Sequence, residues 1–264
     1  MSGSRVIVHL SDLHFGRHDG RLVPQLYTVV WTLRPDIVAV SGDLTQRALP
    51  AQFRKARSFM DGLPSPHLIV PGNHDVPLFN PIARLFTPLR NYTEYITRDL
   101  TPTLSDEIVW ITGVNTTRPT TWKSGRVDAR ALQRVRDGIR GAAPLAVRIL
   151  VAHHPFDAPG TRTSARTLEA LTSAGIDVFL TGHLHARYTG HTAQRYNTGG
   201  RHAIVVEAAT AISTRLRQEP NGFNVLRVAR GSVVVDAYAW DGMTFALTDT
   251  QAFIAHDQGW TAGP

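Results

Sequence analysis

Seven side chains that can bind metal ions lie in short motifs between residues 12 and 185. They are Asp12 and His14, Asp43, Asn73, His153, and His183 and His185. Carboxylate oxygen, amide oxygen and imidazole nitrogen together suit divalent ions such as Mn, Fe and Zn. The chain has no cysteine, so neither thiolate ligands nor disulfides take part. The residue types therefore predict a metal centre, and they leave the identity of the metal open.

Each motif comes directly after a segment with the pattern of a buried strand. Such apolar segments are 6–10, 37–40, 68–70, 147–152 and 177–181. In open α/β sheets, ligand sites lie outside the carboxyl ends of the strands. We therefore expect the candidate ligands to lie on loops at one edge of a sheet.

Helical periodicity alternates with these strands. Apolar residues recur at helical spacing over 22–33, before Pro35, and over 53–63. Asp128 is a candidate N-cap for a further helix, and Leu168 and Leu171 lie on another. A strand is expected over 108–114, and three more are expected at 203–208, 223–228 and 232–240. This order predicts a layered α/β fold with a mixed sheet.

The length of 264 residues fits one domain. We expect that domain over residues 1–250 and a C-terminal tail over 251–264. Residues 76–105 contain no chemical motif, and their apolar residues lie at roughly helical spacing with arginines between them. Two interpretations stay open for this segment: an insertion helix packed on the core, or a cap or lipid-facing surface over the metals.

The order of motifs, D-x-H, G-D, G-N-H-D, a lone His and G-H-x-H, resembles that of the calcineurin-like metallophosphoesterase superfamily. In motif style it is most similar to class III cyclic-nucleotide phosphodiesterases and glycerophosphodiesterases. The resemblance implies an α/β fold of four layers, an αββα sandwich of two mixed β-sheets flanked by helices. It also implies a centre of two divalent metal ions.

The resemblance assigns a role to each motif residue. Asp43 would bridge both ions, because a carboxylate has two oxygens, whereas an imidazole normally binds one ion. Asp12, His14 and His185 would complete the first site, and Asn73, His153 and His183 the second. The spacing of Asp12 and His14 predicts side chains on one face of an extended segment. His74 would be the general acid, and Asp75 would orient it.

Six further residues are candidates for contact with substrate. They are Arg17, His18, Asn115, His154, Arg187 and His191. His154 either faces the substrate or stands behind its neighbour His153. Four other histidines are interpreted as structural, namely His9, His67, His202 and His256.

The predicted activity is that of a phosphodiesterase in which a metal-bridging hydroxide attacks phosphorus in line with the leaving oxygen. A nucleotide-lipid pyrophosphatase and a phosphomonoesterase are alternatives, as is a scaffold without catalysis. The protein phosphatase branch is disfavoured, because its G-D-x-V-D-R-G run reads Gly42-Asp43-Leu44-Thr45-Gln46-Arg47 here. The superfamily's DNA-repair nucleases are disfavoured because the chain has no heptad run.

The formal net charge of +7 favours anionic partners. We expect a small phosphoester substrate and no stable nucleic-acid complex. No apolar run is long enough to span a bilayer, and peripheral membrane contact stays open. No signal-peptide pattern is seen at the start, so a cytoplasmic location is expected. The oligomeric state is not specified by the sequence.

Overall fold

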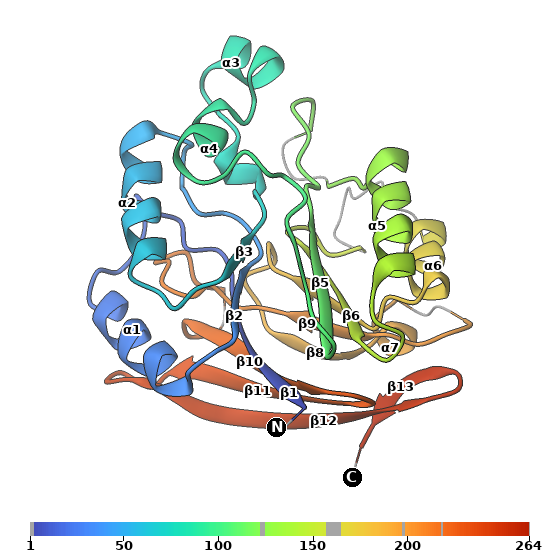
Figure 1. Cartoon of the computed structure of the whole chain (residues 1–264). Coiled ribbons are helices and arrows are strands. Elements are labelled where there is room, and N and C mark those ends of the chain that lie inside the picture. The colour runs from blue at the N-terminus through green and yellow to red at the C-terminus, as the bar shows by residue number, and fades with distance from the viewer. Residues whose placement is uncertain (1–2, 122–124, 157–164, 197–198, 218, 264) are drawn as a thin grey trace.

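The computed structural model describes residues 3–121, 125–156, 165–196, 199–217 and 219–263. Two mixed β-sheets pack face to face, and helices cover their outer faces (Figure 1). The four-layer αββα sandwich expected from the resemblance is therefore confirmed.

The first sheet has the strand order β13-β12-β11-β10-β1-β2-β3. Its strands are β1 (Ser4–Leu10), β2 (Ile37–Val40), β3 (His67–Ile69), β10 (Gly222–Ala229), β11 (Ser232–Trp240), β12 (Phe245–His256) and β13 (Gly259–Ala262). Strands β1, β2 and β3 are parallel to one another, whereas β10 to β13 form antiparallel pairs. The parallel part brings the carboxyl ends of three ligand-bearing strands to one edge.

The second sheet has the order β4-β5-β6-β7-β9-β8. Its strands are β4 (Thr103–Ser105), β5 (Val109–Val114), β6 (Val147–Ala152), β7 (Val178–Thr181), β8 (Tyr188–His191) and β9 (Ile204–Glu207). Strands β5, β6, β7 and β9 are parallel. Their buried, Val- and Ile-rich sequences are typical of strands covered on both faces.

Helices flank the sheets on opposite sides (Figure 1). Helices α1 (Leu22–Leu33) and α2 (Pro50–Asp61) pack on the first sheet, and α5 (Ala129–Gly141) and α6 (Ala165–Ala174) pack on the second. A central apolar core lies between the sheets and includes Ile7, Leu68 and Ile149. A short helix, α7 (Thr192–Tyr196), follows β8.

Local signals account for the ends of several helices. Asp128 caps α5 as predicted, because its carboxylate accepts a hydrogen bond from the Ala131 N–H. Pro50 begins α2, where its missing N–H has no cost. Helix α1 ends at Leu33, before Pro35, as the sequence predicts.

The C-terminal tail predicted for 251–264 is corrected by the structure. Strand β12 continues to His256 in antiparallel pairing with β11, and β13 adds a further strand to it. Trp260 is buried and donates its indole N–H to Asp177. The prediction was wrong because the polar residues 248–251 interrupt the apolar pattern of β12, and Phe253 alone is buried among residues 251–256.

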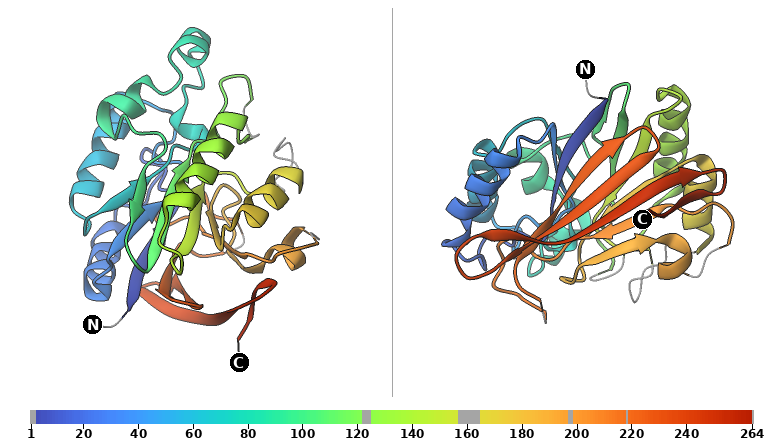
Figure 2. Two further views of the ribbon diagram at one scale, coloured as in Figure 1. Left: turned by 45° about the vertical axis from the view of Figure 1, so that its right-hand side comes forward. Right: turned by 90° about the horizontal axis from the view of Figure 1, so that it is seen from below.

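Residues 76–105 do not form the one insertion helix considered from the sequence. They contain α3 (Pro81–Phe86), α4 (Arg90–Tyr95) and the edge strand β4. Helix α4 packs on the core, and the buried Tyr92 donates its hydroxyl hydrogen to the Ile69 carbonyl. Helix α3 projects away from both sheets (Figures 1 and 2).

Candidate metal centre

All seven predicted ligands lie just past the carboxyl ends of parallel strands. Asp12 and His14 follow β1, Asp43 follows β2, and Asn73 begins a 3-10 turn, η1 (Asn73–Asp75), after β3. The other three ligands follow β6 and β7 of the second sheet. The site therefore lies where the strand ends of the two sheets meet.

The ligand atoms form two groups. In the first, His185 Nε2 lies 3.2 Å from both His14 Nε2 and Asp12 Oδ1. In the second, Asn73 Oδ1 lies 3.1 Å from His153 Nε2 and 3.0 Å from His183 Nδ1. Ligands at about 2.1 Å from a shared ion are separated by roughly 3.0–3.5 Å. Both groups therefore have the spacing of a first coordination sphere.

Asp43 connects the two groups. Its Oδ2 lies 3.6 Å from His14 Nε2, and its Oδ1 lies 3.4 Å from His153 Nε2. The carboxylate is buried, and its Oδ1 also accepts a hydrogen bond from the His74 N–H. One oxygen toward each group is the arrangement that a bridging ligand needs.

Hydrogen bonds orient the histidine ligands. His153 Nδ1 lies 2.8 Å from the Ser41 carbonyl oxygen, and His185 Nδ1 lies 2.8 Å from that of Arg215. A carbonyl accepts only from an N–H, so both rings carry the proton on Nδ1. In the neutral rings, the Nε2 lone pairs would then point at other acceptors, such as Asp12 Oδ1 for His185. Such a meeting of lone pairs is unfavourable without a cation, so the residues present fit bound metal ions.

The electrostatics of the metal-free site lead to the same conclusion. Burial opposes protonation of His153, but the carboxylates of Asp43 and Asp12 outweigh it and raise its pKa to about 9. Burial and the neighbouring His153 lower the pKa of His183 to about 4. Burial raises the pKa of Asp43, yet His153 and His74 outweigh it and hold that pKa well below its usual range. A proton on His153 therefore supplies positive charge beside these carboxylates, as a bound cation would.

Backbone geometry in the ligand loops differs from the expectation for Asp12 and His14. Neither residue is extended; their φ angles are +53° and +48°. Asp43, His183 and His185 also have positive φ. Non-glycine residues are uncommon in this region, and such strain is concentrated at functional sites. The side chains converge through these tight turns and not through the alternation of a strand.

Two glycines of the motifs are required by close packing. Gly42 has a φ of +94°, and a Cβ there would lie 2.8 Å from His153 Nδ1. A Cβ on Gly72 would overlap the Asp43 side chain. Any other residue at either position would push a ligand out of place.

His74 lies at the metal centre without joining either ligand group. Its ring is 4.9 Å from that of His14, and its Nδ1 lies 3.0 Å from the Gln46 carbonyl oxygen. Its Nε2 therefore has a lone pair, which accepts a hydrogen bond of 2.8 Å from Arg215 Nη1. Burial lowers the pKa of His74, and the charge of His14 and Arg215 adds to this, although Asp43 opposes it.

Asp75 does not contact the His74 side chain in the hydrogen bonds that the structure gives. Its carboxylate accepts from the N–H groups of Gly72, Leu44 and Thr45 and from the Thr45 hydroxyl. Burial and the charge of Asp43 raise its pKa to about 6, although these backbone donors oppose the rise. Asp75 therefore fixes the loop after β2 against η1, and it positions His74 through the backbone.

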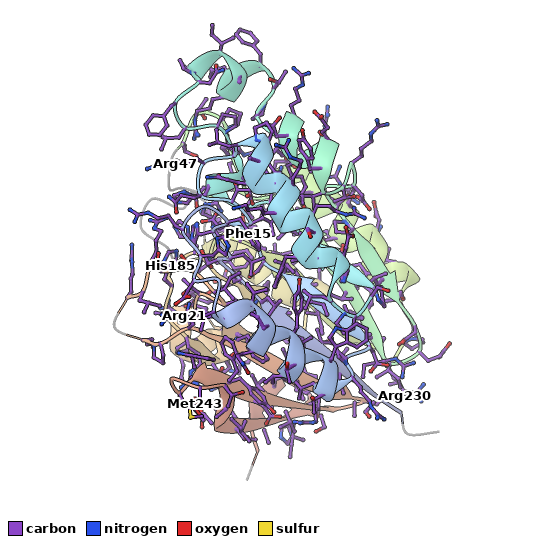
Figure 3. The ribbon with its side chains drawn as sticks, turned by 90° about the vertical axis from the view of Figure 1, so that its left-hand side faces the viewer. Phe15, Arg21, Arg47, His185, Arg230 and Met243 are labelled. Atoms are coloured by element: carbon purple, nitrogen blue, oxygen red, sulfur yellow. The ribbon has the colours of Figure 1, made fainter. Side chains whose placement is uncertain are left out.

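A cavity of about 510 Å³ opens beside these residues. His74, Asp43, Asn73, His183 and His185 line one part of it. Four arginines also line it, namely Arg17, Arg47, Arg215 and Arg217. Figure 3 shows Arg47 and His185 along one edge of the molecule, below α3. A metal pocket with this many cations suits an anionic ligand such as a phosphoester.

Of the six residues predicted to contact substrate, Arg17 lines this cavity and His154 lies beside the second ligand group. The His154 ring is 4.8 Å from that of His153 and 4.7 Å from that of His183. Its Nε2 is buried and has no hydrogen-bond partner in the described part of the chain. Its nitrogen lies close enough to those of His153 and His183 for the three to hold one ion.

The other four candidates do not line this cavity in the described residues. His18 packs against Phe15, and Asn115 accepts hydrogen bonds from Thr117. Arg187 donates to the Thr248 hydroxyl and lines a separate cavity. His191 lies beside His202. Arg187 comes just before β8 and His191 ends it, on the segment that follows His185.

Sequence reasoning did not single out Gln46, Arg47, Leu184, Arg215 or Arg217, which also line the cavity. Gln46 and Arg47 come just after the Gly42-Asp43 motif and could have been found by position. Arg215 and Arg217 lie between β9 and β10, in a segment without a motif. The short run Thr214-Arg215-Leu216-Arg217 was the only signal in the sequence.

The model of the calcineurin-like phosphoesterase family matches residues 5–187. This span is more than half of the chain and contains every candidate ligand, so the chain belongs to this family. Family membership and the His/Asp groups together support a metal-dependent phosphoesterase.

Two curated proteins are similar in sequence. One is glycerophosphodiester phosphodiesterase GpdQ of Enterobacter lignolyticus, 35% identical over 81 residues, which cover 26% of this chain and 29% of that protein. The other is a probable cyclic nucleotide phosphodiesterase of a Synechococcus species, 24% identical over 165 residues, which cover 58% of this chain and 59% of that protein. The chain thus spans less than two thirds of the length of either relative.

Solved structures show the same fold. PhoD matches with a TM-score of 0.71 at 10% identity, over 99% of this chain and 72% of that one. A purple acid phosphatase from yellow lupin (Lupinus luteus) seeds matches with a TM-score of 0.69 at 12% identity, over 95% and 53%. Among the described residues, no helix has the length and apolar character to cross a bilayer.

Proposed function

We propose that this protein is a phosphodiesterase that depends on two divalent metal ions. One observation carries the proposal: Asp43 turns one carboxylate oxygen toward each of two ligand groups. The two relatives named as phosphodiesterases support a diester as the substrate. Mn, Fe and Zn all suit the donor set.

The proposed mechanism divides the work between the metal ions and the chain. When bound, the ions would lower the pKa of a water molecule and withdraw charge from the phosphoryl oxygens. Asp12, His14, Asn73, His153, His183 and His185 would hold them, with Asp43 shared. The pocket arginines would bind the non-bridging oxygens of the phosphate and orient the ester bond for in-line displacement.

His74 is the proposed general acid. A departing alkoxide needs a proton, and His74 is the cavity-lining imidazole that neither ligand group uses. Its Nδ1–H is held by the Gln46 carbonyl, which turns Nε2 toward the cavity. Since Arg215 donates to Nε2 in this structure, two changes must come before proton transfer. The guanidinium must move toward the substrate phosphate, and Nε2 must take up a proton from solvent, which it then delivers to the leaving oxygen.

A substrate panel with added Mn²⁺ tests the proposal. We expect hydrolysis of bis(p-nitrophenyl) phosphate to exceed that of p-nitrophenyl phosphate, and one of the natural diesters, a cyclic nucleotide or a glycerophosphodiester, to be cleaved. His153→Ala should lose this activity, whereas His202→Ala, a histidine outside the metal centre, should retain it. Faster cleavage of the monoester, or of a nucleotide-lipid pyrophosphate, would move the assignment to another branch of the family. Absence of hydrolysis with every metal tested would contradict the proposal.

A further inference from the structure

Helix α3 has its apolar face turned toward solvent. Ile82, Leu85 and Phe86 have the i, i+3, i+4 spacing that places side chains on one face of a helix. They are 72%, 56% and 79% exposed, and Phe79, just before the helix, is 78% exposed. A surface helix normally buries such a face. We call these four side chains the α3 patch.

The polar side of α3 is fixed to the body of the protein. Arg84 donates hydrogen bonds of 2.7 Å to the carbonyls of Pro119 and Thr121, and one of 3.1 Å to that of Pro77. Asn80 caps the helix by accepting from the Ala83 N–H. These contacts hold the orientation of α3, so the outward direction of its apolar face is built into the fold.

The α3 patch adjoins the metal pocket. The Arg47 guanidinium lies 4.8 Å from the centre of the Phe79 ring, and Arg47 also lines the metal cavity. Arg215 and Arg217 line another part of the cavity wall, and Leu216, which lies between them in the chain, is exposed. Apolar side chains that reach solvent therefore flank a pocket rich in arginine.

We propose that the α3 patch and the neighbouring arginines dock on the surface of an anionic phospholipid bilayer. Apolar side chains beside cations match the interface of such a bilayer, where acyl chains lie beneath negatively charged phosphates. The net charge of +7 adds attraction to the same surface. Docking would place the metal pocket close to phosphate groups at the interface.

Charge argues against a second copy of this chain as the occupant. A two-fold dimer places the same patch of both subunits against each other. Arg47 and the other pocket arginines of one copy would then lie near those of its partner. An anionic lipid surface covers the same apolar side chains and neutralises these charges.

Vesicle co-sedimentation tests the proposal without relying on catalysis. The intact protein should bind vesicles containing phosphatidylglycerol, bind pure phosphatidylcholine vesicles much less, and lose binding as salt rises. The double variant Ile82→Ser/Phe86→Ser should weaken binding by about tenfold or more, because two large apolar side chains no longer insert. Phe86→Trp should bind at least as well as the unchanged protein.

Leu145→Ser is the matched control. Leu145 is 66% exposed but lies before the amino end of β6, at the opposite edge of the sheet from the pocket, so this variant should bind vesicles normally. Absence of binding to anionic vesicles at low salt would overturn the proposal. Equal binding by the double variant and the control would do the same.

Two further readouts distinguish lipid docking from dimerisation and from catalysis. If light scattering shows a dimer that the double variant converts to a monomer, and vesicles are not bound, the α3 patch is a subunit interface and the proposal fails. Hydrolysis of a soluble chromogenic diester should be retained by the double variant. If the protein binds vesicles but cleaves no phosphoester, the proposed function fails and the docking surface stands.

Discussion

The metal centre and helix α3 hold their side chains in opposite ways. At the metal centre, buried polar atoms are fixed by partners: Asp12 Oδ2 accepts from the Ser11 hydroxyl and the His183 N–H. The atoms left over point at one another and fit an ion. On α3, the polar side is anchored and the apolar side is left in solvent. In both regions, the proposed ligand is inferred from groups that have no partner among the described residues.

The comparison also predicts that hydrolysis and lipid binding depend on different regions. The ligand loops are fixed between two sheets, whereas α3 stands on a short connection above them (Figure 2). A change at the metal centre should therefore abolish hydrolysis and leave lipid binding intact. A change on α3 should weaken lipid binding and leave hydrolysis of a soluble substrate intact.

The largest effect is expected from Asp43→Ala. The substitution removes the carboxylate that faces both ligand groups. It therefore also removes the negative charge that would reduce repulsion between two bound cations. We expect a loss of diester hydrolysis of more than about a thousandfold, because metal ions contribute several kcal/mol to transition-state stabilisation. Steady-state kinetics would measure it, and vesicle binding should not change. Activity within tenfold of the unchanged protein would show that Asp43 is not essential to the centre.

His74→Ala should separate catalysis from metal binding. We expect both metals to stay bound and the rate on a diester with a poor leaving group to fall roughly 10²–10⁴-fold, the usual effect of losing a general acid. With nitrophenolate as the leaving group, the loss should be smaller, because that anion departs without a proton. Equal losses with both substrates would mean that His74 positions the substrate or supports Asn73, and is not the acid.

Arg215 and Arg217 offer a matched pair within the pocket wall. Arg215 contacts His74 Nε2, whereas Arg217 lines the same cavity without a hydrogen bond to His74 among those that the structure gives. We expect Arg215→Gln to lower kcat by roughly tenfold to a hundredfold and Arg217→Gln to raise KM with little change in kcat. Arg215→Lys should restore part of the loss. Identical kinetics for the two glutamine variants would assign both arginines to general attraction of phosphate.

Metal uptake should release a proton near neutral pH. In the metal-free protein, Asp43 and Asp12 outweigh burial and raise the pKa of His153 to about 9, so His153 is protonated below that pH and must lose its proton to bind an ion. The apparent affinity for Mn²⁺ should therefore rise about tenfold per pH unit between pH 7 and 9 and then level off. An indicator dye would detect the proton, and release of none at pH 7.5 would contradict this.

The smallest effect on catalysis is expected from Arg84→Ala. Losing hydrogen bonds to three carbonyls should loosen α3, so limited proteolysis should cut faster within residues 77–90. Metal content and hydrolysis of a soluble diester should change less than twofold. Arg90→Ala, which changes the exposed first residue of α4, is the control and should leave the cutting rate unchanged. A large loss of metal in Arg84→Ala would show that α3 supports the centre itself.

The ligand set was open to prediction because each ligand belongs to a local motif directly after an apolar strand. His183 and His185, for example, are identified by Gly182 and by the strand before it. We expected Asp12 and His14 to converge through the alternation of an extended segment, whereas the structure brings them together through tight turns. Asp12 and His14 have positive φ, and their N–H groups donate to carbonyls of the loop after β2. A single sequence does not specify such contacts between loops.

Other features depend on tertiary packing and were beyond prediction. Arg215 belongs to no motif, and its place beside His74 follows from the path of the chain between β9 and β10. Periodicity gave the spacing of Ile82, Leu85 and Phe86 but not the side of the helix that faces the body. The carbonyls of Pro77, Pro119 and Thr121, which accept hydrogen bonds from Arg84, decide that orientation. The end of strand β12 was not predicted because the polar residues 248–251 interrupt its apolar pattern, and its pairing with β11 is not visible in the sequence.

The central claim is that Asp43 joins two metal sites, and electron paramagnetic resonance of the Mn²⁺-loaded protein tests it most directly. Two ions about 3.5–4 Å apart and bridged by a carboxylate should give the spectrum of a spin-coupled pair, with two Mn²⁺ per chain by elemental analysis. In Asp43→Ala, the coupled spectrum should be lost and the metal content should fall. One uncoupled Mn²⁺ per chain in the unchanged protein, or a coupled pair that persists in Asp43→Ala, would contradict the account.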